Sequence, residues 1–181
     1  MIFSLFRRDQ RPDTIGTLYG MIVAQARLPV FYRDYGVADT VNGRFDLIVL
    51  HLALVLDRLT ENGVLQPAGQ ALFDRFCQDM DDNLREMGIS DLKVPKEMKR
   101  MGQAFYGRSK AYLAALDDRR ALVAALTRNI YGGAPSAADT APRLADYLAR
   151  AVGDLKAQDA AAIIDGRLRF PDPAAVPVPI A

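Results

Sequence analysis

The sequence contains few of the side chains from which catalytic and metal sites are built. Its 181 residues include one histidine, His51, and one cysteine, Cys77. No second histidine exists to complete a metal site, and the helical Glu-x-x-His pattern of di-iron proteins is absent. No glycine-rich phosphate-binding loop is evident either. We therefore predict a binding protein that is not an enzyme, with no catalytic residue, no metal site and no cofactor.

The chain also lacks a charge excess and a secretory signal. Its formal net charge is +1, so it has none of the bulk positive charge that nucleic-acid binders carry. A single cysteine permits no internal disulfide, which fits a reducing compartment. Residues 1–8 lack both the longer apolar region and the cleavage site of a signal peptide. These features together predict a cytoplasmic protein.

The longest apolar run, in the stretch 44–59, is too short to cross a membrane. Its apolar core, from Phe45 to Leu56, has about 12 residues, whereas a membrane-spanning helix needs about 20. A helix that is apolar nearly all the way round is buried beneath other elements. The run therefore predicts a central helix with other helices packed over most of its circumference.

Proline and glycine punctuate the rest of the chain in a pattern typical of helices. No stretch shows sustained period-two alternation, so strands are not expected, apart from a possible extended piece at 166–170. The fold class predicted is all-α, a single-domain irregular bundle of about six to eight helices. The expected helices span residues 14–28, 29–36, 40–63, 67–88, 95–116, 119–131, 140–155 and about 159–165.

Composition divides the chain into four parts. Residues 1–12 form a basic and apolar N-terminal segment that resembles a weak interfacial anchor. Residues 13–133 form the main helical domain, and residues 134–165 supply one or two further helices packed on it. Residues 166–181 are rich in proline and form an extended tail, either disordered or laid on the body.

Four of the six methionines surround one predicted turn between two helices. Methionine is unbranched and polarizable, so surfaces rich in it accept varied apolar partners. These residues either fill an ordinary core or form a soft groove for a client, to which two aromatic side chains would add larger contacts. The proposed client-binding set is Met80, Met87, Met98, Met101, Phe105 and Tyr106.

A basic face follows on the second of these helices. Residues 73–92 carry a charge of −4 and residues 93–128 a charge of +6, so the near-neutral total conceals a split. This face is either solvated or a platform for anionic lipid or ribosomal RNA. It lacks interleaved aromatic side chains, which argues against sequence-specific nucleic-acid recognition. The basic residues concerned are Lys93, Lys96, Lys99, Arg100 and Lys110.

An alternative site is an interior pocket around the single histidine. Tyr19, Tyr32, Tyr35 and His51 could together hold a quinone or a haem-like ligand. The structural interpretation places His51 at the edge of the core without a ligand. A scaffold for folded soluble partners is a third interpretation, which requires an apolar patch without membrane affinity.

Four strings in order resemble the ubiquinol–cytochrome c chaperone family. They are LYGMIVAQAR (18–27), FYRDYGVADTVNGRFDLIVLHLALVLDRL (31–59), QALFDRFCQDMDDNLREMGISDLKVPKEMKRMGQAFYGR (70–108) and RNIYGG (128–133). The resemblance covers about residues 14–133. It implies an all-α chaperone without a catalytic motif.

The resemblance also implies partners. Members of the family bind newly made cytochrome b and help it to enter respiratory complex III, and mitochondrial members act with a small partner chaperone near the ribosomal exit tunnel. We accordingly expect apo-cytochrome b or complex III assembly intermediates as partners, with the ribosome, a small partner chaperone and peripheral contact with the inner membrane as further candidates.

Overall fold

The computed structural model describes residues 13–61 and 63–178, and it is all-α as predicted. The helices are α1 (Thr14–Ala26), α2 (Pro29–Arg33), α3 (Val41–Arg58), α4 (Pro67–Glu86), α5 (Val94–Leu113), α6 (Arg119–Asn129), α7 (Ala137–Ala157) and α8 (Ala160–Ile164), followed by the 3-10 turn η1 (Pro173–Ala175).

Local sequence signals start these helices. The side chain of Asp13 accepts a hydrogen bond from the backbone N–H of Gly16 at 2.7 Å, and that of Thr40 accepts one from Gly43 at 3.1 Å. Such caps satisfy backbone donors that have no partner within the helix. Helices α2, α4 and α5 instead carry proline in their first turn, where its missing N–H costs nothing.

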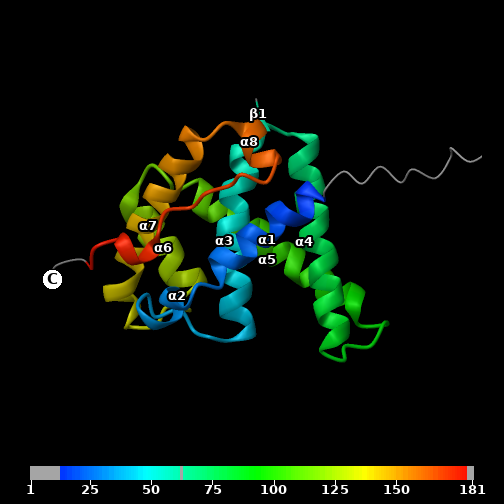
Figure 1. The fold of residues 1–181 in the computed structure, drawn as a ribbon. Helices are drawn as coiled ribbons and strands as arrows, with labels where there is room; N and C mark the ends of the chain where they lie inside the picture. The colour runs from blue at the N-terminus through cyan, green and yellow to red at the C-terminus, as the bar shows by residue number, and fades with distance from the viewer. Residues whose placement is uncertain (1–12, 62, 179–181) are drawn as a thin grey trace, which may run out of the picture.

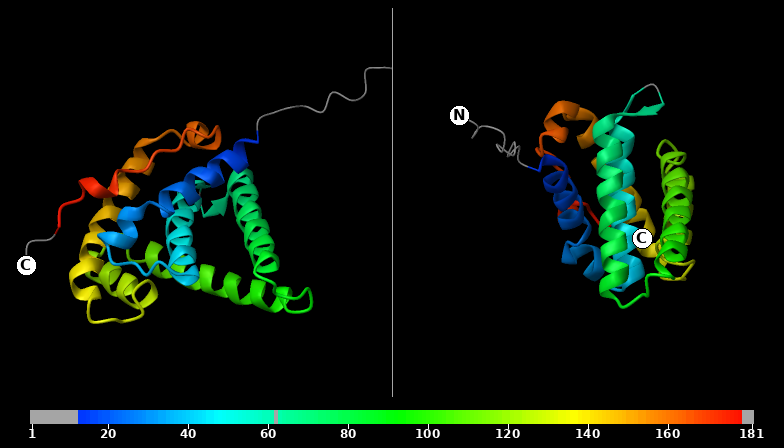
Figure 2. Two further views of the ribbon diagram at one scale, coloured as in Figure 1. Left: turned by 60° about the horizontal axis from the view of Figure 1, so that its bottom comes forward. Right: turned by 90° about the vertical axis from the view of Figure 1, so that its right-hand side faces the viewer.

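Helix α3 is the centre of the molecule (Figure 1). Twelve of its residues are buried, in an unbroken run from Asp46 to Leu56 with Gly43 before it. It packs against α1, α4, α5 and α7, and α1 and α5 lie on opposite sides of the layer that α3 forms with α4 (Figure 2). The long apolar run is therefore the central buried helix that the sequence predicts.

A small β-hairpin follows α3, which the sequence analysis did not anticipate. Strand β1 (Thr60–Glu61) pairs antiparallel with β2 (Val64–Leu65). Gly63 has a φ of +77°, the left-handed conformation that glycine adopts without strain. Helix α3 thus ends at Arg58 rather than at the predicted glycine. Strands of two residues are too short to show the alternation on which strand prediction depends.

The chain after α8 runs along the body as an extended segment (Figures 1 and 2). Tyr35 donates a hydrogen bond from its hydroxyl to the carbonyl of Pro173 at 2.7 Å, and Arg143 donates from Nη2 to the carbonyl of Val176 at 3.0 Å. Leu168 and Val176 are buried in the core. The sequence analysis left two alternatives for the tail, disordered or laid on the body. The described part of the tail, residues 166–178, lies on the body.

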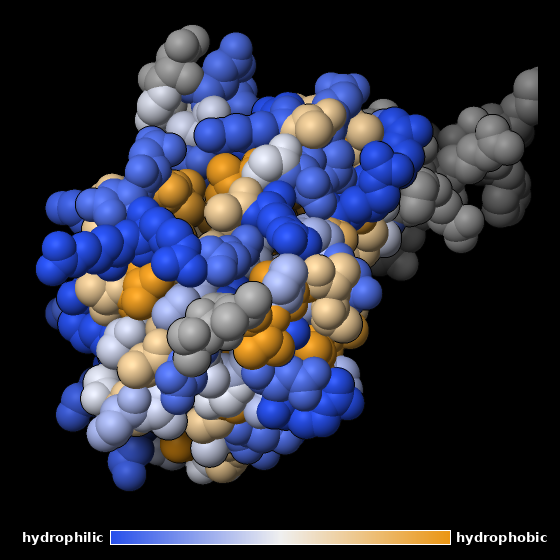
Figure 3. Space-filling view, turned by 90° about the vertical axis from the view of Figure 1, so that its left-hand side faces the viewer, coloured by the Kyte–Doolittle hydropathy of each residue, from blue (hydrophilic) through white to orange (hydrophobic). Residues whose placement is uncertain are grey.

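The surface beside this tail is mostly hydrophilic. Figure 3 shows this face, on which apolar side chains appear in separate patches among hydrophilic ones. Within residues 13–61 and 63–178, no helix combines the length and the apolar character that a membrane crossing requires. The N-terminal segment 1–12, for which we predict an interfacial anchor, lies outside the described residues.

Candidate functional site

Three of the four clustered methionines line one apolar groove. The groove has a volume of about 170 Å³ and lies between α3, α4 and α5, near the end of α1. The methionines are Met80 on α4, Met87 just after it, and Met101 on α5. The other lining residues are Arg27, Val41, Arg44, Phe45, Ile48, Asn83 and Leu84.

The groove has a buried floor and an exposed apolar rim. Met80 and Leu84 are 6% and 7% exposed, whereas Met87 and Val41 are 54% and 66% exposed. Apolar side chains that are exposed together beside a concave surface mark a candidate binding site. Met98, the fourth methionine, packs against the core and does not line the groove. Of the four methionines in the predicted client-binding set, three therefore line this groove and Met98 does not.

The two predicted aromatic contacts have different positions. Phe105 is 4% exposed and lies 5.4 Å from Phe76 and 5.0 Å from Phe73, measured between ring centroids. It is therefore part of the core and cannot present a surface to a client. Tyr106 is 64% exposed and packs against Phe73 at 5.8 Å. Neither residue lines the groove, although both lie on α5.

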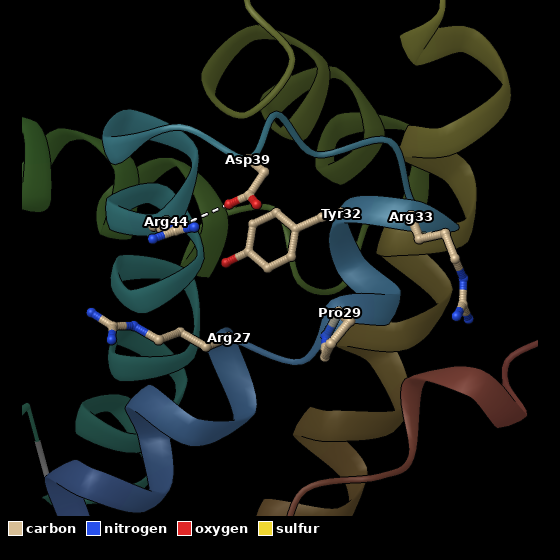
Figure 4. A pocket seen from close by; sticks show the side chains of 6 residues that line it. All are labelled: Arg27, Pro29, Tyr32, Arg33, Asp39 and Arg44. Carbon is tan, nitrogen blue, oxygen red and sulfur yellow. Dashed lines mark hydrogen bonds and ion pairs between the residues drawn. The ribbon is translucent and has the colours of Figure 1, made fainter.

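A second, basic cavity shares a wall with this groove. It has a volume of about 490 Å³ and is lined by Arg27, Pro29, Tyr32, Arg33, Asp39 and Arg44 (Figure 4). Two of these residues, Arg27 and Arg44, also line the methionine groove. Sequence analysis did not single them out, because Arg27 directly follows α1 and Arg44 lies in α3, and neither belongs to a local cluster of basic residues.

Polar partners already occupy most of the groups in the basic cavity. Arg44 Nε lies 2.7 Å from Asp39 Oδ1, and this pairing lowers the pKa of the Asp39 carboxyl. The hydroxyl of Tyr32 donates to the carbonyl of Ala26 at 3.0 Å. Within the described part of the chain, the side chain of Arg27 has neither an ion pair nor a hydrogen bond. The cavity therefore presents a free positive charge at the edge of the groove.

The predicted basic face on α5 is exposed to solvent. All five of its residues are exposed: Lys93, Lys96, Lys99, Arg100 and Lys110. Arg100 Nη2 lies 2.8 Å from Glu97 Oε2, so one of the five charges has an acidic neighbour on its own helix. Because the side chain of Arg100 is 78% exposed, this pair adds little stability. The face is available to an anionic surface.

His51 is completely buried, and both ring nitrogens form hydrogen bonds. Its Nδ1 lies 2.7 Å from the carbonyl oxygen of Leu47, which can only accept, so Nδ1 carries the proton. Its Nε2 accepts a hydrogen bond from the Tyr147 hydroxyl at 2.9 Å. The rings of Phe31 and Phe170 pack against the imidazole. Burial lowers the pKa of His51 to about 4, so the ring is neutral.

The structure brings only part of the alternative tyrosine pocket together. Tyr35 and His51 both contact the ring of Phe31 in one buried aromatic cluster. Tyr19 instead donates from its hydroxyl to Asp79 Oδ2 at 2.7 Å, on α4, and Tyr32 lines the basic cavity. The geometry around His51 favours the structural interpretation, because its nitrogens already have partners.

A buried ion pair, which the sequence analysis did not anticipate, lies between α3 and α5. Arg108 Nη2 lies 3.0 Å from Asp46 Oδ1, and the carboxylate is 7% exposed. Burial raises the pKa of Asp46 to about 6, and the positive charge of Arg108 partly opposes this rise.

Burial and the nearby Asp74 also raise the pKa of the Cys77 thiol. Neither Asp46 nor Cys77 has the environment of an activated nucleophile.

No metal site accompanies these features. Across residues 13–61 and 63–178, no group of three or more histidine, cysteine, aspartate or glutamate side chains is placed to hold a metal ion. What the site offers is an adaptable apolar groove, a charged wall at one side of it and a separate basic face.

Comparisons with known proteins agree with this description. Residues 33–170 match the family described as Ubiquinol-cytochrome C chaperone. The crystal structure of the Cbp3 homolog from Brucella abortus is similar, with a TM-score of 0.81 and 38% sequence identity over 91% of this chain and 92% of that chain. Among curated proteins, none matches significantly. The chain belongs to the ubiquinol–cytochrome c chaperone family.

Proposed function

We propose that this chaperone binds newly made cytochrome b through the methionine groove and promotes its assembly into respiratory complex III. Apo-cytochrome b and complex III assembly intermediates are then its partners. The observation that carries the proposal is the groove itself, where Met80, Met87 and Met101 meet between three helices. Cytochrome b is a bundle of membrane helices whose apolar surfaces aggregate in water, so a holding chaperone needs an adaptable apolar surface.

The position of the groove supports this role. Exposed apolar side chains on a soluble protein mark a binding site when they border a concave surface. Met87 and Leu92, 54% and 94% exposed, lie in the turn between α4 and α5. This turn projects from the body (Figures 1 and 2), so a helix of the client can approach it without steric hindrance from the rest of the chain.

The basic face on α5 suits a second contact, with the inner membrane or with the ribosome. Both surfaces are anionic and attract exposed lysine and arginine side chains. The proposed location is therefore the cytoplasm, in peripheral association with the inner membrane. A small partner chaperone is a further candidate for this surface.

Site-specific photo-crosslinking tests the groove. A photo-reactive amino acid at Met87 is expected to crosslink cytochrome b in cells that synthesise it. Val178 provides a matched control, because it is an exposed apolar residue, 68% exposed, at the far end of the described chain. Crosslinks from position 87 only within the chaperone, or equal crosslinking to cytochrome b from both positions, would contradict the proposal.

Charge reversal tests the basic face. Lys96→Glu is expected to weaken binding to anionic vesicles or to ribosomes at low salt, while the melting temperature stays unchanged because exposed charges contribute little stability. Arg120→Glu is the control, since Arg120 is an exposed arginine on a different helix, α6. Equal loss of binding in both variants would show that only the total charge matters.

A further inference from the structure

Two arginines stand at the boundary between the methionine groove and the basic cavity. Arg27 follows directly after α1 and Arg44 lies in the first turns of α3, and both line both cavities. Figure 4 shows their side chains extending to the same side of the Tyr32 ring, one above the other. We call Arg27 and Arg44 the arginine pair.

The arginine pair is under-neutralised. Asp39 is the one carboxylate that lines the basic cavity, and it contacts Arg44. Arg33 forms its ion pair with Asp34 at 2.5 Å and points away from the other two arginines (Figure 4). Arg27 has no ion pair within the described part of the chain. Two positive charges beside a single carboxylate, which is paired with Arg44 alone, attract a further anion, and guanidinium groups bind carboxylates in a bidentate manner.

The size of the groove indicates what enters beside that anion. An engineered protein cavity of about 150 Å³ admits one benzene molecule. At about 170 Å³, the methionine groove has room for a side chain of phenylalanine or leucine size. The acyl chain of a lipid is much larger than this. The volume therefore favours a peptide segment over a phospholipid.

Taking the proposed client groove as its basis, we propose that this site selects apolar helices that carry an acidic residue one helical turn from an apolar anchor. The anchor occupies the methionine groove, and the carboxylate binds the arginine pair. Side chains three or four residues apart on a helix are neighbours on one face, about 5–6 Å apart at Cβ. Because Arg27 and Arg44 line both cavities, a carboxylate bound to them lies next to the methionine groove, as a side chain one helical turn from the anchor requires.

Asp39 has a definite part in this recognition. Its carboxylate holds Arg44 at 2.7 Å in the free protein and competes with an incoming carboxylate for the same guanidinium. Removing its charge therefore strengthens the attraction for an acidic ligand. Because Asp39 and Arg44 are both more than half exposed, the substitution changes binding without threatening the core.

Peptide binding by the full chain, followed by fluorescence anisotropy, tests the proposal. The probes are three labelled amphipathic helical peptides with one phenylalanine anchor and, four positions later, Glu, Gln or Lys. The Glu peptide is expected to bind about tenfold more tightly than the Gln peptide, because a hydrogen bond to a charged group contributes more than a neutral one. The Lys peptide is expected to bind most weakly, because it meets like charge.

Variants of the protein show which residues cause the preference for the Glu peptide. Arg27→Gln and Arg44→Gln are expected to abolish the preference for Glu over Gln, whereas Arg33→Gln, at the same cavity but paired with Asp34, leaves it unchanged. Asp39→Asn is expected to increase the preference. Met87→Ser is expected to weaken binding of all three peptides equally, because it alters the apolar anchor site.

The outcomes separate this inference from the proposed function. Equal affinity for the three peptides, with binding lost in Met87→Ser, would overturn the charge selectivity and leave the groove in place. Failure of every peptide to bind would overturn both. Displacement of the Glu peptide by phosphatidylglycerol vesicles that depends on Arg27, without any preference among the peptides, would assign the arginine pair to lipid and also overturn the inference.

Discussion

Acidification of the protein tests the buried environment of its single histidine. In the folded state His51 is neutral, donates from Nδ1 to Leu47 and accepts at Nε2 from Tyr147. Protonating Nε2 would replace its acceptor by a donor facing a hydroxyl and would place a charge in the core. Burial therefore lowers the pKa of His51 to about 4, against about 6.5 in the unfolded chain.

The size and sign of the effect follow from this difference. Since the pKa is lowered in the folded state, the unfolded chain binds a proton first as the pH falls. The stability that His51 contributes is fully present above about pH 6.5 and is lost as the pH falls towards about 4. A difference of this size corresponds to about 3 kcal/mol of unfolding free energy.

Asp46 opposes this trend over nearly the same range. Its pKa is raised from 3.8 to about 6, so the folded state binds the proton first. The stability that Asp46 contributes is present below about pH 4 and is lost as the pH rises through about 6, again by about 3 kcal/mol. The two groups therefore nearly cancel in the unaltered protein, and single variants are needed to reveal either.

Urea denaturation of two variants, from about pH 4 to about pH 7, provides the assay. Relative to the unaltered protein, Asp46→Asn is expected to lose stability on acidification, because the His51 effect is no longer balanced. His51→Gln is expected to gain stability on acidification relative to the unaltered protein, because the Asp46 effect is no longer balanced. Surface carboxylates are common to all three proteins, so they cancel in the differences. Proton NMR of the one imidazole in the chain gives a direct check.

Two results would refute this reasoning. An imidazole that titrates near pH 6.5 in the folded protein would show that His51 is accessible to solvent. A stability difference between Asp46→Asn and the unaltered protein that does not change with pH would show that neither burial nor Arg108 perturbs the carboxyl.

Two further predictions concern packing and are checked by thermal unfolding. Gly43→Ala is expected to cost at least about 2 kcal/mol, because the new Cβ would lie 2.0 Å from the backbone carbonyl of Ala38, whereas Gly20→Ala, with no atom within 4 Å of the new Cβ, is expected to keep or raise stability. Unchanged melting in both would contradict the close approach at Ala38. Leu52→Ala, at a fully buried position of α3, is expected to cost about 2–5 kcal/mol, and an unaltered transition would show that this helix is an exposed surface instead.

The helices of this protein could be predicted from local sequence because local interactions start and end them. Asp13 and Thr40 cap α1 and α3 where the sequence indicates, and Pro67 opens α4. The burial of α3 follows from composition alone, since an apolar circumference must be covered. The predicted end of α3 at Gly63 was wrong, because the helix ends at Arg58 and the hairpin that follows consists of only two residue pairs, which give no periodic signal.

The candidate site was predictable only in part. The grouping of four methionines around one turn was visible in the sequence, because residues on two successive helices that meet at a turn are neighbours. Which of them face outward was not visible: Met98 packs on the core and Phe105 is 4% exposed, although helical periodicity allowed either orientation. Orientation depends on which neighbouring helix covers each face.

By itself, the sequence determined the helical fold, the central buried helix and the family. Only the tertiary structure decided which distant residues meet. It joins Arg27 to Arg44 at one wall, and it places Tyr147 against His51 across 96 positions of the chain. The physical reason is that capping and periodicity act within a few residues, whereas such contacts are set by the packing of whole helices.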